Sequence, residues 1–491
     1  MVGQTDSIHA KMLRNAGPLL GLALLAYFLL VPPWEPLTAA GMRAIGVFLF
    51  TIIWWSTVGI TYPSLLCLVL LVLTGVMSPA AAYGAAAGNW IVFFLLGSFG
   101  LCEAMRVTGF TTRFALWFLT RPIAEGRPWV LLSLFLLACT LMGAVMSVTA
   151  TAIVFITIAG SMLEALGFRR GDRFAASLMM GVAWTATAAH AMTPIAHVTN
   201  LMMIQWLDRD FGYTISFPQW MSIGIPAGLV AWLLIMAFLR YVVRPDLTRF
   251  SQMPAGFLER QQQELGAMEP AERVAVGTFL AVVLVWVFPD LAGGLSPGLS
   301  SYVASIGYAV PALAGACLLC LVHVRGQPVL TFQQWMGKGV DWGSMVLVMA
   351  ILALGDVIAQ PELGITGLLT RVFEPVISGM APYSFLFVTV LWTAAQTNVL
   401  SNLVSMTTVY TIMGPLAGAA GIANPVAMGM TIAAASCYAF ALPSATTATA
   451  LVIGSGWVPV KFMLRYGLLL ILPVVVLFTF FFYPLAAAVL R

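Results

Sequence analysis

Continuous apolar stretches, repeated along the whole chain, constrain its fold more than any other feature. A membrane-spanning helix needs about 20 apolar residues, whereas the strands of a membrane β-barrel alternate in polarity with a period of two. Because the stretches are continuous, they exclude a barrel. The sequence therefore predicts an all-α polytopic membrane protein with about 11 transmembrane helices. The stretches lie near residues 17–33, 40–58, 62–77, 129–146, 174–206, 219–243, 271–289, 302–321, 383–400, 424–442 and 462–489.

The composition excludes several other classes of protein. Of the 491 residues, 61% are hydrophobic and 8% are charged, against about 25% charged residues in an ordinary soluble domain. A soluble enzyme, a disordered protein and a nucleic-acid-binding protein are therefore excluded. The six cysteines are scattered, and the sequence has no His-Glu-x-x-His motif. We therefore expect no catalytic residues, no metal centre and no cofactor.

Lysine and arginine residues indicate the orientation, because they are retained in cytoplasmic loops. Lys11 and Arg14 lie near the N-terminus, three arginines lie within 167–173, and the loop at 290–301 has no basic residue. The sequence therefore predicts a cytoplasmic N-terminus, an external C-terminus and insertion in the inner (cytoplasmic) membrane of the cell. The polar segment 244–270 is expected to be a cytoplasmic linker.

The two halves of the chain, 1–243 and 271–491, show the same order of features, which predicts two inverted repeats. Each half contains an apolar region that is broken by glycine and polar residues, at 77–128 in the first half and at 341–381 in the second. Such irregular backbone is tolerated at membrane depth when it is buried in protein or lines a cavity. We interpret both regions as re-entrant helical hairpins.

Each predicted hairpin is followed by helices that break at polar clusters. One pair of clusters lies at 147–151 and 405–408, and a second pair lies at 185–194 and 436–447. A broken membrane helix leaves backbone N–H and C=O groups that need partners, and a bound ion satisfies them. Duplicated hairpins and broken helices are typical of secondary transporters, whose substrate site lies near the membrane midplane. A purely structural bundle has no use for such irregular backbone.

The expected substrate is a small organic anion. Helix N-termini and hydroxyl groups favour anionic oxygens, and the breaks contain no lysine or arginine. Dipoles and neutral donors would therefore hold the anion. The candidate substrate-binding residues are Ser147, Val148, Thr149, Thr187, His190, Asn402, Ser405, Met406, Thr407 and Thr446.

From Leu37-Thr-Ala-Ala-Gly-Met-Arg43 to the last helix, the chain resembles the divalent anion/sodium symporter family of the ion transporter superfamily. The duplicated hairpins and serine–threonine clusters carry this resemblance. It implies an elevator-type transporter with a scaffold domain and a moving transport domain. It also implies a homodimer in the lipid bilayer that carries a di- or tricarboxylate, or sulfate.

The chain departs from the family at the residues that the resemblance would assign to sodium. The two Ser-Asn-Thr motifs of the family correspond here to Ser147-Val148-Thr149 and Ser405-Met406-Thr407, and of the two Pro-Pro-Asn motifs only Asn200 keeps its asparagine. In the family, the motif asparagines contribute to sodium coordination. Valine and methionine supply no oxygen ligand for a hard cation. We therefore expect weakened or absent sodium sites, which disfavours Na⁺ as the coupling ion.

Three modes of coupling stay open: anion exchange, proton coupling and sodium coupling. Obligate exchange of one anion for another needs no cation. Proton coupling would use His190 or His197, because histidine titrates near physiological pH. Sodium coupling would need sites rebuilt around Asn398 and Asn402, which lie within two turns before Ser405. The candidate coupling-ion residues are His190, Asn398, Asn402 and Asn200.

Overall fold

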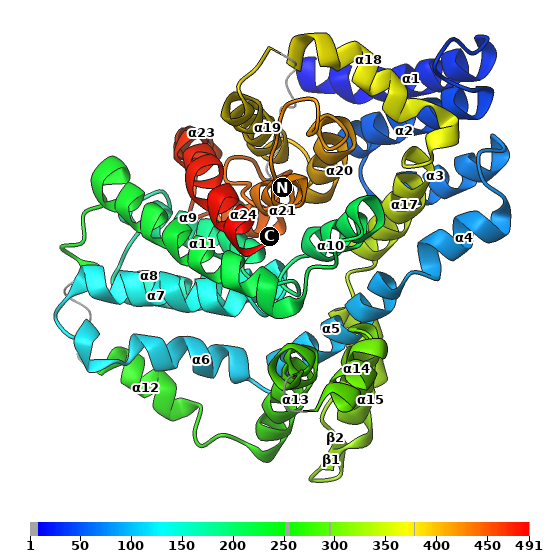
Figure 1. The fold of residues 1–491 in the computed structure, drawn as a ribbon. Coiled ribbons are helices and arrows are strands. Elements are labelled where there is room, and N and C mark those ends of the chain that lie inside the picture. Colours follow the sequence, from blue (N-terminus) through cyan, green and yellow to red (C-terminus); the bar gives the residue numbers. More distant parts are fainter. Residues whose placement is uncertain (1–7, 251–255, 294–295, 378, 491) are drawn as a thin grey trace. The chain divides into compact units, whose positions relative to one another are not determined.

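The computed structural model describes residues 8–250, 256–293, 296–377 and 379–490, and it is built almost entirely from helices (Figure 1). Strands β1 (His323–Val324) and β2 (Gln327–Pro328) form one short antiparallel pair. In these ranges six helices are long and apolar enough to cross a membrane, or eight if each of two bent helix pairs counts as one span. Four shorter apolar helices accompany them. The predicted polytopic all-α membrane architecture is confirmed, although breaks divide several expected spans.

The chain divides into two compact units, each described by itself. The first unit contains residues 1–92, 341–385 and 407–423, and the second contains 93–340, 386–406 and 424–491. Each unit takes segments from both predicted halves. The halves 1–243 and 271–491 therefore describe a repeat along the sequence and do not coincide with the compact units.

In the first unit, α2 lies close to the turn that precedes α18. Gly364 has a φ of 73°, and a Cβ atom at this position would lie 1.9 Å from the carbonyl oxygen of Pro36. Only glycine combines this backbone conformation with such a close approach. The helices of this unit are α1 (Ile8–Leu30), α2 (Ala39–Thr57), α3 (Thr61–Leu73), α4 (Pro79–Ala87), α17 (Trp342–Ile358), η6 (Pro361–Leu363) and α18 (Ile365–Ile377).

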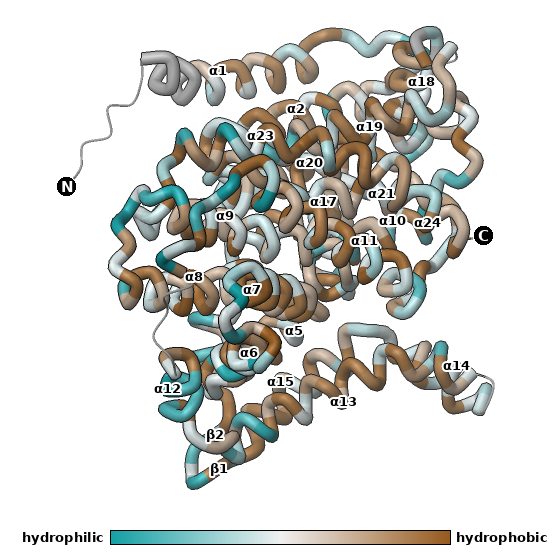
Figure 2. Tube along the Cα trace, turned by 90° about the vertical axis from the view of Figure 1, so that its left-hand side faces the viewer, coloured by the Kyte–Doolittle hydropathy of each residue, from teal (hydrophilic) through white to brown (hydrophobic). Residues whose placement is uncertain are grey.

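The second unit holds most of the apolar helices. In Figure 2, hydrophobic residues dominate α11 and α13, whereas hydrophilic residues gather at α12. Both α11 and α23 end in a π-helical turn, at Leu239–Val243 and Phe478–Phe482. The helices of this unit include α5 (Trp90–Val107), α6 (Phe110–Leu119), α7 (Pro128–Gly143), α8 (Val148–Ala165), α9 (Arg173–Ala188), α10 (Val198–Phe211), α11 (Phe217–Phe238), α12 (Phe257–Glu264), α13 (Pro270–Ala292), α14 (Pro297–Ser305), α15 (Ala309–Leu321), α19 (Pro382–Thr397), α20 (Asn402–Met413), α21 (Pro425–Ser436), α22 (Thr447–Gly454), α23 (Val460–Leu477) and α24 (Tyr483–Val489); α5, α19 and α20 extend into the first unit.

Two helix–tip–helix hairpins repeat with closely matched dimensions. α7 and α19 each have 16 residues, and each ends in a four-residue tip, at 144–147 and 398–401, before α8 and α20 begin. A 16-residue helix is about 24 Å long, which is shorter than the roughly 30 Å hydrocarbon core of a bilayer. These dimensions suit hairpins whose tips end inside the membrane.

These two hairpins lie later in the chain than the regions 77–128 and 341–381, and the re-entrant character of those regions stays a prediction. In the region 77–128, α4 and α5 together form one candidate span, Pro79–Val107. The glycine and asparagine at 88 and 89 interrupt the helix for only two residues. The polar tips at 144–147 and 398–401, which the sequence analysis took for breaks within a span, are the points where the chain reverses.

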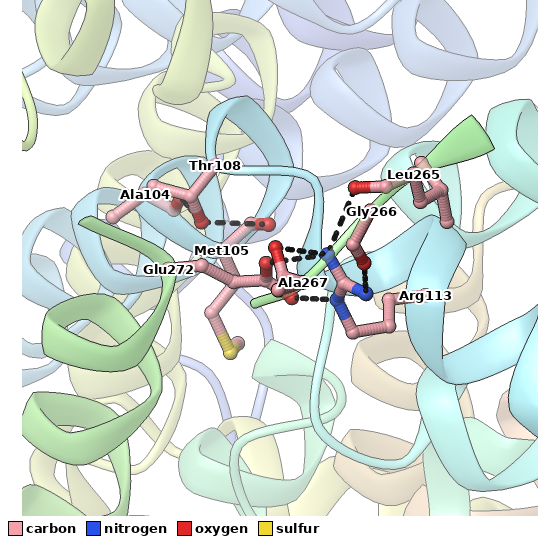
Figure 3. A network of polar contacts seen from close by, with 8 residues as sticks. All are labelled: Ala104, Met105, Thr108, Arg113, Leu265, Gly266, Ala267 and Glu272. Carbon is pink, nitrogen blue, oxygen red and sulfur yellow. Dashed lines mark hydrogen bonds and ion pairs between the residues drawn. The ribbon is translucent and has the colours of Figure 1, made fainter. Parts of the chain in front are cut away.

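The predicted linker 244–270 is tied to α6 through one arginine. The Arg113 side chain pairs with both carboxylate oxygens of Glu272, at 2.6 and 3.1 Å, and donates a hydrogen bond of 2.8 Å to the carbonyl oxygen of Gly266 (Figure 3). The side chain of Glu272 is only 2% exposed. Arg113 therefore holds the end of the linker and the start of α13 against α6.

We expect the Arg113→Leu substitution to destabilise the protein by roughly 3–5 kcal/mol, because it leaves the Glu272 carboxylate buried without its charge partner. Thermal unfolding of the purified protein in detergent measures the effect. Arg325→Leu is the matched control, because Arg325 and Glu269 form an exposed pair at 3.4 Å that contributes about 0–1 kcal/mol. Equal melting temperatures for the two variants would contradict the assignment.

Candidate functional site

The tips of the two hairpins end in serines at equivalent positions. Ser147 directly precedes α8, where its Oγ accepts from the Ala150 N–H and its carbonyl oxygen accepts from the Thr151 N–H at 3.0 Å. Ser401 directly precedes α20, and its carbonyl oxygen accepts from the Ser405 N–H at 2.9 Å. Ser401 is therefore the structural counterpart of Ser147, and Ser405 is the counterpart of Thr151.

This equivalence gives the second hairpin a different counterpart of the first motif. The sequence analysis paired Ser147-Val148-Thr149 with Ser405-Met406-Thr407, but those later residues lie a full turn inside α20. By its place in the hairpin, the counterpart of Ser147-Val148-Thr149 is Ser401-Asn402-Leu403. Asn402 is therefore the positional counterpart of Val148, and it carries an amide that Val148 lacks.

The residues 405–407 lie inside the protein. All three are fully buried, and within the described residues the hydroxyl groups of Ser405, Thr407 and Thr151 have no hydrogen-bond partner. The division into compact units falls directly after Met406, so Thr407 belongs to the first unit and Ser405 to the second. These three residues lie one turn beyond the tip residues Ser401 and Asn402, inside α20.

Two helix N-termini from opposite halves meet in the second unit. The Oγ1 atoms of Thr149, in the first turn of α8, and Thr447, the first residue of α22, are 3.0 Å apart. Thr446 caps α22 by accepting from the Thr449 N–H. Thr149 is half-buried and Thr447 is exposed, so the hydroxyl groups are accessible. Helix N-termini present free N–H groups and partial positive charge, and their combination with hydroxyl groups suits a carboxylate or another oxyanion.

Asn398 holds the second break, the irregular stretch between α21 and α22, and all hydrogen-bonding groups of its amide are used. Its Oδ1 accepts from the backbone N–H groups of Phe440, at 2.7 Å, and Ala441, at 2.9 Å. Its Nδ2 donates to the carbonyl oxygens of Ala394, at 2.7 Å, and Tyr438, at 3.3 Å. Both lone pairs of the amide oxygen are used, so the structure gives this predicted coupling-ion residue a positioning role.

Asn402 keeps part of its amide available. Its Oδ1 accepts from the Thr397 hydroxyl at 2.9 Å, and that hydroxyl also contacts the carbonyl oxygen of Ser436. An amide oxygen has two lone pairs, so one remains for a cation. Amide, hydroxyl and carbonyl oxygens are ligands that hard cations accept. In the described ranges, no group of three or more His, Cys, Asp or Glu residues offers a metal site.

Asn200 holds the first break, the irregular stretch between α9 and α10. Its Nδ2 donates to the carbonyl oxygens of His190, at 2.7 Å, and Thr193, at 2.8 Å. Thr187 uses its hydroxyl within α9, where it donates to the carbonyl oxygen of Ala183. The structure therefore gives the Asn200 Nδ2 a backbone-holding role. The Thr187 hydroxyl is occupied by its hydrogen bond within α9.

Comparison with known families identifies the chain. Residues 13–486 match the model of the sodium:sulfate symporter transmembrane region. The chain belongs to this family. It is a transmembrane secondary transporter and not an enzyme.

Two relatives of this sodium:sulfate symporter family member carry the same description, sodium-dependent dicarboxylate transporter SdcS. The protein from Staphylococcus saprophyticus is 27% identical over 96% of this chain and 92% of its own length. The protein from Staphylococcus aureus strain USA300 is also 27% identical, over 92% of this chain and 86% of its own length. The similarity extends across both halves.

Among solved structures, the Alcanivorax borkumensis YdaH transporter is similar in fold. The match covers 97% of this chain and 98% of that chain, with a TM-score of 0.58 and 16% sequence identity. At this identity the likeness concerns the fold alone. It supports the polytopic helical architecture of the symporter family member described here.

The first break of this family member contains two adjacent histidines. The ring centroids of His190 and His197 are 4.7 Å apart, with 33° between the ring planes. His197 is the N-cap of α10 and accepts from the Thr199 N–H through Nδ1. Within the described residues, neither ring nitrogen of His190 has a partner, although the residue is only 1% exposed. An unsatisfied buried polar group costs about 1–3 kcal/mol, so a ligand for His190 would offset a real penalty.

The sequence analysis missed Ser401, Thr447 and Thr397. The spacing of Ser401 and Asn402 from Pro382 equals that of Ser147 and Val148 from Pro128, and this signal could have placed the second motif. The contact between Thr149 and Thr447 depends on the packing of α22 against α8, which has no local signal in the sequence.

Proposed function

We propose that the chain transports small dicarboxylate-type anions and that the N-termini of α8 and α22 bind a substrate carboxylate. The contact between Thr149 and Thr447 carries this proposal, because it unites two half-helix N-termini from the two repeats. The names of the staphylococcal relatives support the same class of substrate. Neutral donors hold the anion loosely enough for release on the other side.

Sodium coupling through the second half follows from the corrected motif. The expectation of sodium-independent transport assumed that both motif asparagines were lost, and Asn402 removes half of that basis. In this proposal, Asn402 contributes an oxygen to one sodium ion, whereas Val148 leaves the first half without the equivalent ligand. The sodium dependence named for the relatives supports this assignment.

Obligate anion exchange is the second candidate, and Val148 is the observation that favours it. An exchanger needs no cation ligand in either half. Uptake that requires an internal anion and ignores sodium would establish exchange in place of symport.

The wider arrangement of the transporter is also a proposal. We infer an elevator movement of a transport domain within a homodimer, in the cytoplasmic membrane with the N-terminus in the cytoplasm and the C-terminus outside. The division of the chain into two compact units is compatible with such a movement. The arginines of the loop at 167–173 support the orientation.

We expect the double substitution Thr149→Val and Thr447→Val to lower succinate affinity by about 10–100-fold, because a hydrogen bond to a charged group contributes about 1.5–3 kcal/mol. Uptake of labelled succinate into proteoliposomes measures the effect. Thr157→Val is the matched control, because its hydroxyl lies exposed on the same helix and donates to the Ile153 carbonyl oxygen.

Competition tests the substrate class in the same vesicles. Succinate, citrate, sulfate and acetate are each added in excess over the labelled succinate. We expect succinate to compete best. Competition by sulfate alone would contradict the dicarboxylate assignment, as would unchanged succinate affinity in the double variant.

A further inference from the structure

His190 occupies an unusual electrostatic position in the first break. It lies in the 3₁₀ turn that directly follows α9, whose last residue is Ala188. The carbonyl end of a helix carries partial negative charge and stabilises a cation within about one turn. The two ring nitrogens of this buried histidine have no partner in the described part of the chain. A free acceptor nitrogen at a helix C-terminus is a suitable place for a proton.

We propose that His190, together with His197, forms a one-proton binding site that couples proton movement to anion transport in the first half. The inference rests on the proposed function, because it assigns a coupling ion to the substrate site described above. It gives the first half a cation where Val148 has removed the amide oxygen that Asn402 retains in the second half.

The two histidines are placed to share a single charge. His197 stands at the N-terminus of α10, where partial positive charge disfavours protonation, and its Nδ1 is already an acceptor for the Thr199 N–H. In the neutral tautomer that accepts this bond, His197 carries its proton on Nε2. With the rings 4.7 Å apart, a charge on His190 opposes a second charge on His197. The pair therefore binds one proton in addition to those of the two neutral rings.

No acidic or basic side chain lies close by on the elements that pack against the turn. α7, α9, α11 and α21 contact it. Their ionisable residues are Cys139 on α7 and Arg173 at the far end of α9, and Cys437 and Tyr438 directly follow α21. α10 carries Asp208, Arg209 and Asp210 only at its distant end. Among the described residues of these elements, His197 is therefore the ionisable neighbour best placed to respond to His190.

The proton site is mechanically connected to the first hairpin tip. The Thr193 hydroxyl donates to the carbonyl oxygen of Ala144, which begins the tip that ends at Ser147. Gly143, the last residue of α7, directly precedes Ala144. A Cβ atom added to Gly143 would lie 2.9 Å from the Cβ of Ala189. The break and the tip are therefore in close contact. A proton that alters the break also acts on the N-terminus of α8, where the anion binds.

A test measures succinate uptake and proton entry together in proteoliposomes containing a trapped pH indicator. In the wild-type protein, acid on the side of the added succinate should raise succinate accumulation by about tenfold for each pH unit at full coupling, and protons should enter with the anion. In His190→Gln, both responses should disappear. His323→Gln, at the exposed edge of β1, should behave as wild type.

Histidine-selective ¹⁵N NMR gives a readout that needs no transport. The chain has four histidines, and the signal that is lost in His190→Gln should report the protonation of that ring as the pH is lowered. Wild-type uptake that ignores the pH gradient, or a full gradient response in His190→Gln, would overturn the coupling while the dicarboxylate assignment stands. Absence of succinate binding and uptake under every gradient would overturn the proposed function and, with it, this coupling.

Discussion

Much more sodium should be needed to activate succinate uptake in the Asn402→Val variant than in the wild-type protein. The substitution gives the second hairpin the residue that the first already has at Val148, and it removes the tip amide, whose oxygen accepts only one hydrogen bond in the described part of the chain. Loss of a neutral ligand to a charged group costs about 1.5–3 kcal/mol, so the half-activating sodium concentration should rise about 10–100-fold. Initial rates measured over a sodium series, with choline keeping the ionic strength constant, give this value.

The reciprocal substitution supplies the control. Val148→Asn restores an amide oxygen to the first hairpin, and it should make the dependence on sodium concentration steeper. Val148→Leu changes size without adding an oxygen and should leave the sodium curve in place. The assignment would fail if Asn402→Val kept the wild-type sodium response, or if wild-type uptake were indifferent to sodium.

Asn398→Ala should be the most destabilising substitution in the second break. Asn398 is 1% exposed, and its loss leaves the N–H groups of Phe440 and Ala441 buried without their acceptor. Each unsatisfied group costs about 1–3 kcal/mol, so we expect a loss on the order of 3 kcal/mol or more. Thermal unfolding in detergent and the yield of monodisperse protein measure it.

Asn89→Ala is the control for this experiment, because Asn89 accepts one hydrogen bond from the Ile91 N–H in a half-buried position. It should cost about 1 kcal/mol. A melting temperature for Asn398→Ala as high as that of Asn89→Ala would show that the second break does not depend on this amide. The coupling-ion role predicted for Asn398 would then need to be considered again.

The membrane class and the repeat were accessible from the sequence, because both depend on long apolar stretches and their order. The positions of the hairpins were not. The region 77–128 contains more glycine than the true tip at 144–147, yet α4 and α5 continue almost without interruption. A glycine permits a reversal of the chain, but the apolar length on either side decides whether the reversal occurs.

The register of the second motif shows a related limit. Ser401 and Ser405 are both serines with suitable neighbours, and the Ser-x-Thr spacing of 405–407 matches that of 147–149. What separates them is the backbone hydrogen bond from the Ser405 N–H to the Ser401 carbonyl oxygen, which begins α20. Helix starts of this kind are set by the three-dimensional packing of the tip, so side-chain types alone did not place it.

The roles of the asparagines were also hidden, because they depend on where broken backbones direct their N–H and C=O groups. Asn200 and Asn398 were candidates for cation ligands because an amide oxygen can bind a hard cation. In the structure each amide binds backbone groups, Asn200 through the carbonyl oxygens of His190 and Thr193, and Asn398 through two carbonyl oxygens and the N–H groups of Phe440 and Ala441. Asn402 differs because, among the described residues, its amide makes no hydrogen bond to the backbone, and its Oδ1 accepts only from the Thr397 hydroxyl.

If the proposed coupling to one sodium ion and one proton holds, the difference between Val148 and Asn402 has a consequence for how voltage acts on the transporter. A doubly charged anion that moves with one sodium ion and one proton crosses the membrane without net charge. Its accumulation then follows the two ion gradients and ignores the membrane potential. A second sodium ion, admitted by asparagine at position 148, would leave one charge uncompensated, worth about 2.3 kcal/mol per 100 mV. Under this proposal, one residue in one repeat would decide between electroneutral and voltage-driven uptake.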